Sequence, residues 1–160
     1  MRFVADGMLG RFARWLRLLG CEVEYMNDAS DERLMEIAER EERVLLTRDV
    51  ELHRRARGRG IEAHLVEGRN EPERLANVAR RFGIMLEVDT SISRCPTCNS
   101  PIKPVVKSEV EDRIPPTTRR IYDEFWVCTG CGKVYWQGGH WKKINEVLAR
   151  ANKILESQGS

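Results

Sequence analysis

The sequence contains no apolar run that approaches the length of a membrane span, and its first residues do not form a secretory signal peptide. A transmembrane helix needs roughly 18 or more apolar residues in succession. The composition, 41% hydrophobic and 32% charged, is typical of a globular protein. A chain of 160 residues can hold one ordinary domain and a small additional module. We therefore expect a soluble, cytoplasmic protein.

Lysine is absent from residues 1–91, where 16 arginines face 18 acidic residues and the net charge is −2. Residues 92–160 hold 11 Lys and Arg against 7 acidic residues, a net charge of +4. The positive part is also the part that contains most of the cysteines. A positive surface of this kind suits a polyanion such as a nucleic acid.

The five cysteines do not form an even set for disulfide bonds. Four of them form two Cys-x-x-Cys pairs, Cys95 with Cys98 and Cys128 with Cys131, and Cys21 stands alone. Two such pairs supply the four thiolates of a closed tetrahedral zinc site. We predict a structural zinc ion that supports the folding of the surrounding segment. A redox-active dithiol pair is the alternative, and Cys21 is expected to be an inert core residue.

The 29 residues between the two cysteine pairs leave room for two hairpins. Aromatic residues of this region (Tyr122, Phe125, Trp126 and Trp136) have two possible uses, which are stacking on nucleic-acid bases and packing inside the small zinc module. We expect packing. Two interpretations of His140 are left open, namely a functional role and a hydrogen bond to a turn carbonyl.

Short apolar segments alternate with amphipathic ones in the first part of the chain. We expect strands at 2–5, 22–26, 43–47, 61–66 and 84–88, and helices at 8–19, 28–40, 50–57 and 72–82. This alternation predicts an α/β fold in which helices cover both faces of a mostly parallel sheet. Right-handed crossovers favour the order second, first, third, fourth strand.

Acidic residues follow two of the predicted strands. Asp6 follows the first strand directly, and Asp49 comes two residues after the third. The predicted order makes these strands neighbours at the switch point of the sheet, so the two acids should meet there. Adjacent carboxylates repel each other unless a cation joins them. Mg²⁺ or Mn²⁺ takes such oxygen ligands and promotes attack on a phosphodiester.

A third carboxylate is expected from the start of the second helix, where Asp31 is the first choice and Asp28 the alternative. Both have a structural explanation too, because Asp28 or Ser30 can cap the helix and an acid in the first turn is favourable.

Arginines surround this predicted site. Arg11 and Arg14 lie with Arg17 on the polar face of the first helix, and Arg48 precedes Asp49. Arg11, Arg14 and Arg48 are candidates for contacts with substrate phosphates. A solvated helix face is the alternative for each of them.

These residues together resemble the PIN-like RNase domain family named for the C-terminus of the Mut-seven exonuclease. The resemblance rests on residues 6–20, on Asp-Ala-Ser-Asp at 28–31 and on Leu-Leu-Thr-Arg-Asp at 45–49. It continues through both cysteine pairs, Tyr-Asp-Glu-Phe-Trp at 122–126 and Gly-His-Trp at 139–141.

The resemblance implies a PIN-like, Rossmann-like nuclease domain at 1–91 and a zinc ribbon at 92–140. The apolar spacing from Trp141 to Leu155 predicts a C-terminal helix at 141–160 that packs back on the body. It implies RNA cleavage that depends on Mg²⁺ or Mn²⁺ bound by Asp6, Asp31 and Asp49. PIN domains generally have a fourth acidic or hydroxyl position, for which Glu67 is the candidate here because Glu51 is too near Asp49. Such nucleases often dimerise, which leaves the oligomeric state open.

Two other functions fit parts of the sequence. One is a non-catalytic RNA-binding or ribosome-associated module in which the zinc ribbon binds and the acids are caps and turn residues. The other is a receiver-like phosphoacceptor that uses Asp49. The acid pair expected after the first strand of a receiver is missing, because Asp6 is followed by Gly7.

Overall fold

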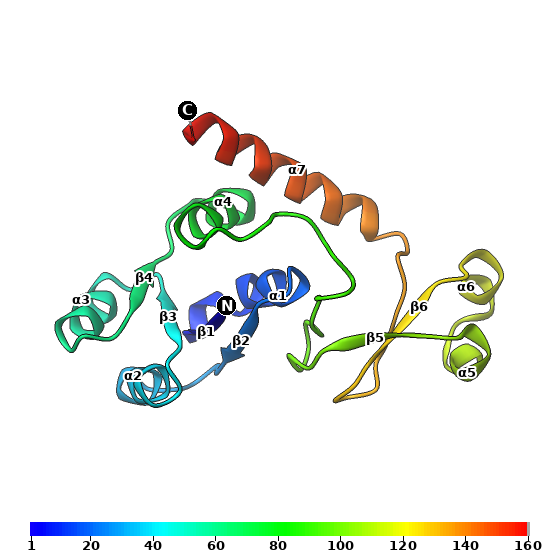
Figure 1. The fold of residues 1–160 in the computed structure, drawn as a ribbon, viewed down its shortest axis with the longest axis horizontal. Coiled ribbons are helices and arrows are strands. Elements are labelled where there is room, and N and C mark those ends of the chain that lie inside the picture. Colours follow the sequence, from blue (N-terminus) through cyan, green and yellow to red (C-terminus); the bar gives the residue numbers. More distant parts are fainter. Residues whose placement is uncertain (160) are drawn as a thin grey trace.

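The computed structural model describes residues 1–159 and contains an α/β body, an antiparallel ribbon and a long final helix (Figure 1). In chain order the elements are β1 (Arg2–Ala5), the 3-10 helix η1 (Gly7–Leu9), α1 (Gly10–Leu18), β2 (Glu22–Tyr25), α2 (Asp31–Arg40), β3 (Val44–Thr47), α3 (Val50–Gly58), β4 (Ala63–Leu65), α4 (Glu71–Phe82), β5 (Ile102–Val105), α5 (Lys107–Val110), η2 (Glu111–Arg113), α6 (Pro116–Ile121), β6 (Phe125–Cys128), β7 (Val134–Tyr135) and α7 (Trp141–Gln158). Ser160, the last residue of the predicted C-terminal segment, lies outside the described residues. Among the described helices, none is both long and apolar enough to cross a membrane.

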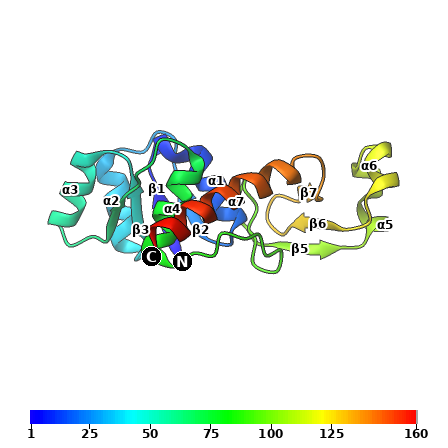
Figure 2. The same cartoon turned by 90° about the horizontal axis from the view of Figure 1, so that it is seen from above.

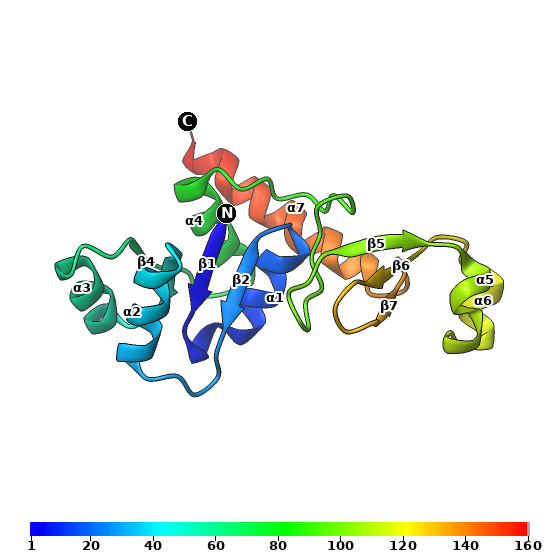
Figure 3. The same ribbon diagram turned by 60° about the horizontal axis from the view of Figure 1, so that its bottom comes forward.

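The first sheet is parallel throughout and has the order β2-β1-β3-β4, which confirms the predicted fold class and strand order. Figure 3 shows β1 and β2 as neighbouring arrows that point the same way. In the central pair, Ala5 lies opposite Leu46, so β1 and β3 end at the same edge of the sheet. The backbone N–H of Asp6 continues this pairing by donating to the carbonyl of Leu46 (3.2 Å).

Alternate residues of the strands face two separate cores. Phe3 and Leu46 pack with α1 and α4 on one face, whereas Val4 and Leu45 pack with α2 and α3 on the other. Every residue of β3 is buried, as expected for a central strand that is covered on both faces. The body is therefore a three-layer α/β structure with the strand ends at its edge.

Residues 84–88 do not form the fifth strand that their alternation predicted. Leu86 is buried against the core of α1 and α4, and Met85 is exposed, so the inward and outward alternation is real. The carbonyl of Leu86 accepts a hydrogen bond from the side chain of Asn152 in α7 (2.9 Å). The segment is thus held by a helix side chain and not by a neighbouring strand.

The second sheet is antiparallel, with the order β5-β6-β7, and forms the ribbon (residues 92–140). Only one strand pair, β5 with β6, spans the interval between the cysteine pairs, and α5, η2 and α6 connect the two strands. The two hairpins that the spacing allowed are therefore not formed. Figure 2 shows the ribbon extending away from the α/β body, with α5 and α6 at its far end.

The last helix, α7, lies across α4 (Figure 1). Leu148 and Ala151 are its buried residues, and they join the core that contains Val78 and Ala79 of α4. This contact covers the outer side of α4 and returns the end of the described chain to the body.

A buried arginine joins the ribbon to the body. Arg17 donates through Nε and Nη2 to the carbonyl of Val23 in β2 (3.0 and 2.8 Å) and through Nη1 to the carbonyl of Pro96 (2.9 Å). The side chain of Asn99 accepts from the N–H of Val23 (3.0 Å). Burial lowers the pKa of Arg17 from its usual value. Arg17 was placed on the exposed arginine face of α1 by its spacing, and its burial corrects that expectation.

Candidate active site and metal centre

The first acidic residue, Asp6, lies at the end of β1 and is almost fully buried, with 6% of its surface exposed. Its Oδ1 accepts a hydrogen bond from the N–H of Met8 (3.0 Å), so the carboxylate caps η1. Its Oδ2 accepts a hydrogen bond from the hydroxyl of Thr47. These two bonds fix the carboxylate in one orientation at the edge of the sheet.

The hydroxyl of Thr47 connects two of the predicted site residues. It donates to Asp6, and its oxygen accepts the backbone N–H of Asp49 (3.0 Å). Thr47 is fully buried at the end of β3, where water cannot replace this hydroxyl. Thr47 is part of the Leu-Leu-Thr-Arg-Asp motif at 45–49, but its hydroxyl had no predicted role. The signal that identifies it is a hydroxyl residue at the last position of an otherwise apolar buried strand.

The second acidic residue, Asp49, is exposed and caps α3. Its Oδ1 accepts from the N–H groups of Glu51 (2.9 Å) and Leu52 (3.2 Å). Within residues 1–159 its other oxygen, Oδ2, has no hydrogen-bond partner. One oxygen of Asp49 therefore serves the helix, and the other is available for a ligand.

Asp31 begins α2 and is engaged with a different partner. Its carboxylate forms an ion pair with Arg55 of α3 (3.3 Å), and 46% of its side-chain surface is exposed. Ser30 caps α2 by accepting from the N–H of Arg33 (3.1 Å), and Asp28 is exposed. The Thr47 hydroxyl thus links the Asp6 carboxylate to the backbone of Asp49, whereas the Asp31 carboxylate is paired with Arg55 of α3.

The three candidate substrate-binding arginines have different surroundings. Arg11 and Arg14 are exposed on α1. Arg48 is half-buried, and its Nη1 donates to the carbonyls of Val66 (2.9 Å) and Gly68 (3.1 Å). Arg48 therefore holds the loop after β4, whereas Arg11 and Arg14 are open to solvent.

Glu71, the first residue of α4, was missed by sequence reasoning. Its Oε2 is buried and has no hydrogen-bond partner in the described part of the chain, and only 19% of its side chain is exposed. Burial raises the pKa of Glu71, and the opposing charges of Arg74, Arg11 and Arg48 reduce this effect. A partly buried acid among arginines depends on the packing of α4 beside α1, for which the sequence holds no signal.

The four paired cysteines form a compact cluster. Their sulfur atoms all lie within 4.8 Å of one another, with 3.8 Å between Cys95 and Cys131 and 3.3 Å between Cys98 and Cys128. Zinc–sulfur bonds of about 2.3 Å give a tetrahedron with edges of about 3.8 Å. The cluster therefore fits a zinc ion bound by four thiolates. In residues 1–159 it is the only set of three or more His, Cys, Asp and Glu side chains gathered in this way.

The surroundings of the cluster shift the pKa values of its thiols in opposite directions, since burial raises the pKa of Cys128 to about 11. Hydrogen bonds from Ser100 lower the pKa of Cys98 to about 6. The N–H groups of Gly130 and Cys131 donate to the sulfur of Cys128 (3.3 and 3.4 Å). A side chain at Gly130 would collide with Ser100, since its first carbon atom would lie 2.2 Å from the hydroxyl oxygen. Cys21 lies outside the cluster, and burial raises its pKa to about 11.

The model of the family described as Mut7-C RNAse domain matches residues 1–148. The chain belongs to the Mut7-C RNAse domain family. This match covers the α/β body, the ribbon and the first half of α7, and it confirms the resemblance seen in the sequence motifs. Membership in the Mut7-C RNAse family indicates a ribonuclease-type function with RNA as the substrate class. Comparisons with curated proteins and with solved structures found no match.

The cysteine cluster of this Mut7-C RNAse domain protein makes a direct prediction about metal content. The purified chain should contain about one zinc ion, because the four sulfur atoms complete one tetrahedral site. Cys98→Ser should reduce the zinc content to well below half, as measured by elemental analysis after dialysis. Cys21→Ala is the matched control and should retain the metal. Full zinc in Cys98→Ser, or a zinc-free parent with oxidised cysteine pairs, would contradict the assignment.

Proposed function

We propose that the protein is a metal-dependent ribonuclease whose active site lies where β1 and β3 end. The observation that carries this proposal is the buried Thr47 hydroxyl, which donates to the Asp6 carboxylate and accepts the backbone N–H of Asp49 at the sheet edge. Carboxylates at the carboxyl ends of adjacent parallel strands occupy the position where α/β sheets bind their ligands. Membership in an RNase family supports the same reaction class.

Asp6, Asp49 and Asp31 are the residues that we propose to hold Mg²⁺ or Mn²⁺. The donor set suits such an ion, because both metals prefer carboxylate oxygens and Asp49 Oδ2 has no partner within the described residues. Asp31 reaches the ion only by sharing its carboxylate with Arg55 or by leaving that ion pair. A bound divalent ion supplies charge neutralisation at the phosphodiester and lowers the pKa of water.

The protein groups have separate tasks in this proposal. The hydrogen bonds from Met8 and Thr47 keep the Asp6 carboxylate from turning, so its charge stays at one point. Arg11 and Arg14, exposed on the helix that follows Asp6, bind phosphates of the RNA backbone. Arg48 contributes indirectly by fixing the loop after β4.

Glu71 is a better candidate for the fourth acidic position than Glu67. Glu67 is exposed, whereas Glu71 has a buried oxygen without a partner in residues 1–159 and feels the charges of Arg11 and Arg48. Arg11 is in α1 and Arg48 directly follows β3, which supports a position of Glu71 near the proposed site.

One observation favours a second candidate, a non-catalytic RNA-binding module. Asp49 caps α3 and Asp31 is paired with Arg55, so two of the three acids also have structural roles. In that case the positively charged ribbon would bind RNA without any divalent ion in the body. RNA binding that persists without added Mg²⁺ or Mn²⁺, together with no cleavage in their presence, would favour this function.

Asp49→Asn tests the proposed mechanism without removing the helix cap. Asparagine caps helices as well as aspartate does, so the variant should fold like the parent and should lose RNA cleavage. The loss in kcat/KM should exceed the 10–100-fold typical of outer-shell changes. Glu51→Gln, which removes a charge two residues away, should cleave normally. A folded Asp49→Asn protein with full Mg²⁺- or Mn²⁺-dependent activity would refute the mechanism.

Thr47→Val tests whether the shared hydroxyl positions the two acids. Valine keeps the size of the side chain but removes the donor to Asp6 and the acceptor for the Asp49 N–H. We expect kcat/KM to fall by about 10–100-fold and the concentration of Mg²⁺ needed for half-maximal rate to rise. Thr47→Ser restores a hydroxyl and should recover most of both values. Equal losses in the serine and valine variants would show that packing, and not the hydroxyl, matters.

Glu71→Gln tests the fourth acidic position. If Glu71 shares in binding the divalent ion, the variant should need more Mg²⁺ or Mn²⁺ for cleavage and should have a lower kcat. Glu67→Gln is the matched control with the same chemical change on the preceding loop, and it should leave the metal titration unchanged. The reverse result, with the defect in Glu67→Gln alone, would return the assignment to Glu67.

A further inference from the structure

An apolar cavity of about 250 Å³ lies between the ribbon, the segment before it and the start of α7. Aromatic side chains form much of its wall, namely Trp126, Tyr135, Trp136 and Trp141, and Gln137 and His140 complete that side. Three of the four tryptophans of the chain therefore line one cavity, while Trp15 packs against the core of the body.

The size of this cavity limits what it can hold. Pockets for drug-sized ligands occupy about 300–1,000 Å³, and this one is smaller. It is large enough for a single planar ring system and too small for a folded peptide or a cofactor of several rings. Flat indole and phenol rings offer stacking surfaces to any nucleobase.

Some residues that line this mostly apolar cavity carry polar groups without a protein partner in residues 1–159. Within residues 1–159, the Gln137 amide and the His140 ring make no hydrogen bond to the protein, and neither do the indole N–H groups of the three lining tryptophans. An amide and an imidazole can both donate and accept hydrogen bonds, as recognition of base edges requires.

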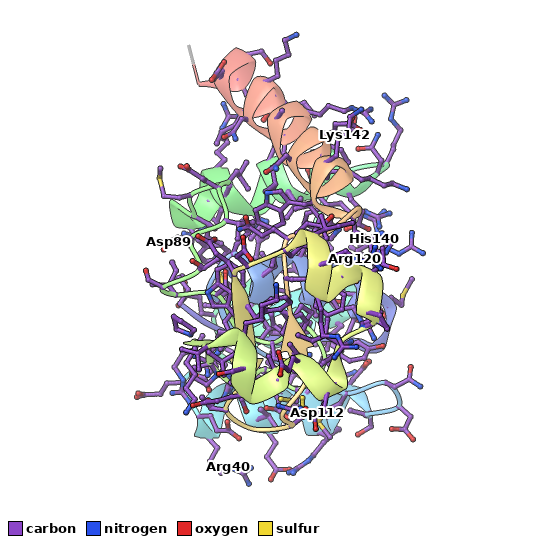
Figure 4. All side chains as sticks on the ribbon, turned by 90° about the vertical axis from the view of Figure 1, so that its right-hand side faces the viewer. Arg40, Asp89, Asp112, Arg120, His140 and Lys142 are labelled. Carbon is purple, nitrogen blue, oxygen red and sulfur yellow. The ribbon has the colours of Figure 1, made fainter. Side chains whose placement is uncertain are left out.

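The charge around the cavity matches a nucleic-acid strand. Arg94 is one of the lining residues, and Lys142 and Lys143 are exposed directly after Trp141. Figure 4 shows His140 and Lys142 on the same side of the start of α7, with Asp89 on the opposite side. Cations beside an aromatic cavity can hold the phosphates on either side of a bound base.

The helix α1 connects the cavity with the proposed active site. Leu18, at the end of α1, is one of its lining residues, and Asp6 precedes the start of that helix. The nine residues of α1 cover roughly 13 Å along the axis, and Arg11 and Arg14 are exposed between its ends. This separation corresponds to a few nucleotides of a single strand.

We propose that the cavity binds one unpaired nucleobase of an RNA strand, a few nucleotides away from the bond that is cleaved. The placement relative to the cleaved bond rests on the proposed ribonuclease function. Binding of the base itself requires neither Mg²⁺ nor cleavage, so the two proposals can fail separately.

The four tryptophans allow a direct test with an internal control. Adenosine 5′-monophosphate is titrated into the zinc-bound, ¹⁵N-labelled protein without other divalent ions, and the four indole N–H signals are followed by NMR. The signals of Trp126, Trp136 and Trp141 should shift and saturate together, while that of Trp15 should stay in place. Ribose 5-phosphate should cause none of these shifts, because it carries the phosphate without a base.

Two results would overturn the proposal. Equal shifts with ribose 5-phosphate would mean that only the phosphate binds. An absence of selective shifts with the nucleotide would mean that the cavity is only a packing gap between the ribbon and the body. Selective shifts in a protein that cleaves no RNA would support the base site and reject the nuclease. Cleavage without selective shifts would do the opposite.

A substitution then tests the site with RNA itself. Trp141→Ala should weaken binding of a short single-stranded RNA about tenfold, in the range of stacking by one base. Trp141→Phe keeps a ring and should retain most of the affinity. Ile154→Ala, a similar truncation farther along α7 and outside the cavity, is the control and should bind normally. Unchanged affinity in a folded Trp141→Ala protein would contradict the proposal.

Discussion

The pairing of β1 with β3 is the constraint on which the candidate site depends. Its register places Asp6 beside the end of β3, where the hydroxyl of Thr47 reaches both Asp6 and the backbone of Asp49. A shift of one residue would turn Thr47 toward the opposite face of the sheet. Two acids that are far apart in the sequence thus share one hydrogen-bonded group, and solvent cannot substitute for it because the position is buried.

Much of this arrangement could be predicted from local pattern. Buried strands that alternate with amphipathic helices indicated the parallel sheet, and crossover handedness gave the strand order that brings Asp6 and Asp49 to one edge. Three features depend on contacts that no local pattern encodes. Arg17 has the spacing of an exposed residue and is buried by the ribbon, residues 84–88 alternate like a strand and are held by α7, and Glu71 is enclosed only because α4 packs beside α1.

The acids of the candidate site also stabilise the helices around it. Asp49 caps α3 with one oxygen and leaves the other without a partner in residues 1–159, so the cap fixes the orientation of the carboxylate. Asp31 is different, because its partner Arg55 also contacts Glu32, which in turn pairs with Arg59. This network connects α2 with α3, so a substitution of Asp31 would affect the contact between the two helices.

The contacts of Arg17 and Asn99 have a consequence for self-association. β2 is the outer strand of the parallel sheet, and such a strand offers unpaired backbone groups to other chains. Here the side chain of Asn99 accepts the outward N–H of Val23 and Arg17 donates to its carbonyl, while Pro96 and Asn99 are next to Cys95 and Cys98 of the cysteine cluster. The ribbon thereby covers the outer edge of β2 through residues next to the cysteine cluster. Loss of the contacts from Arg17 and Asn99 would therefore expose the backbone edge of β2 to pairing with other chains.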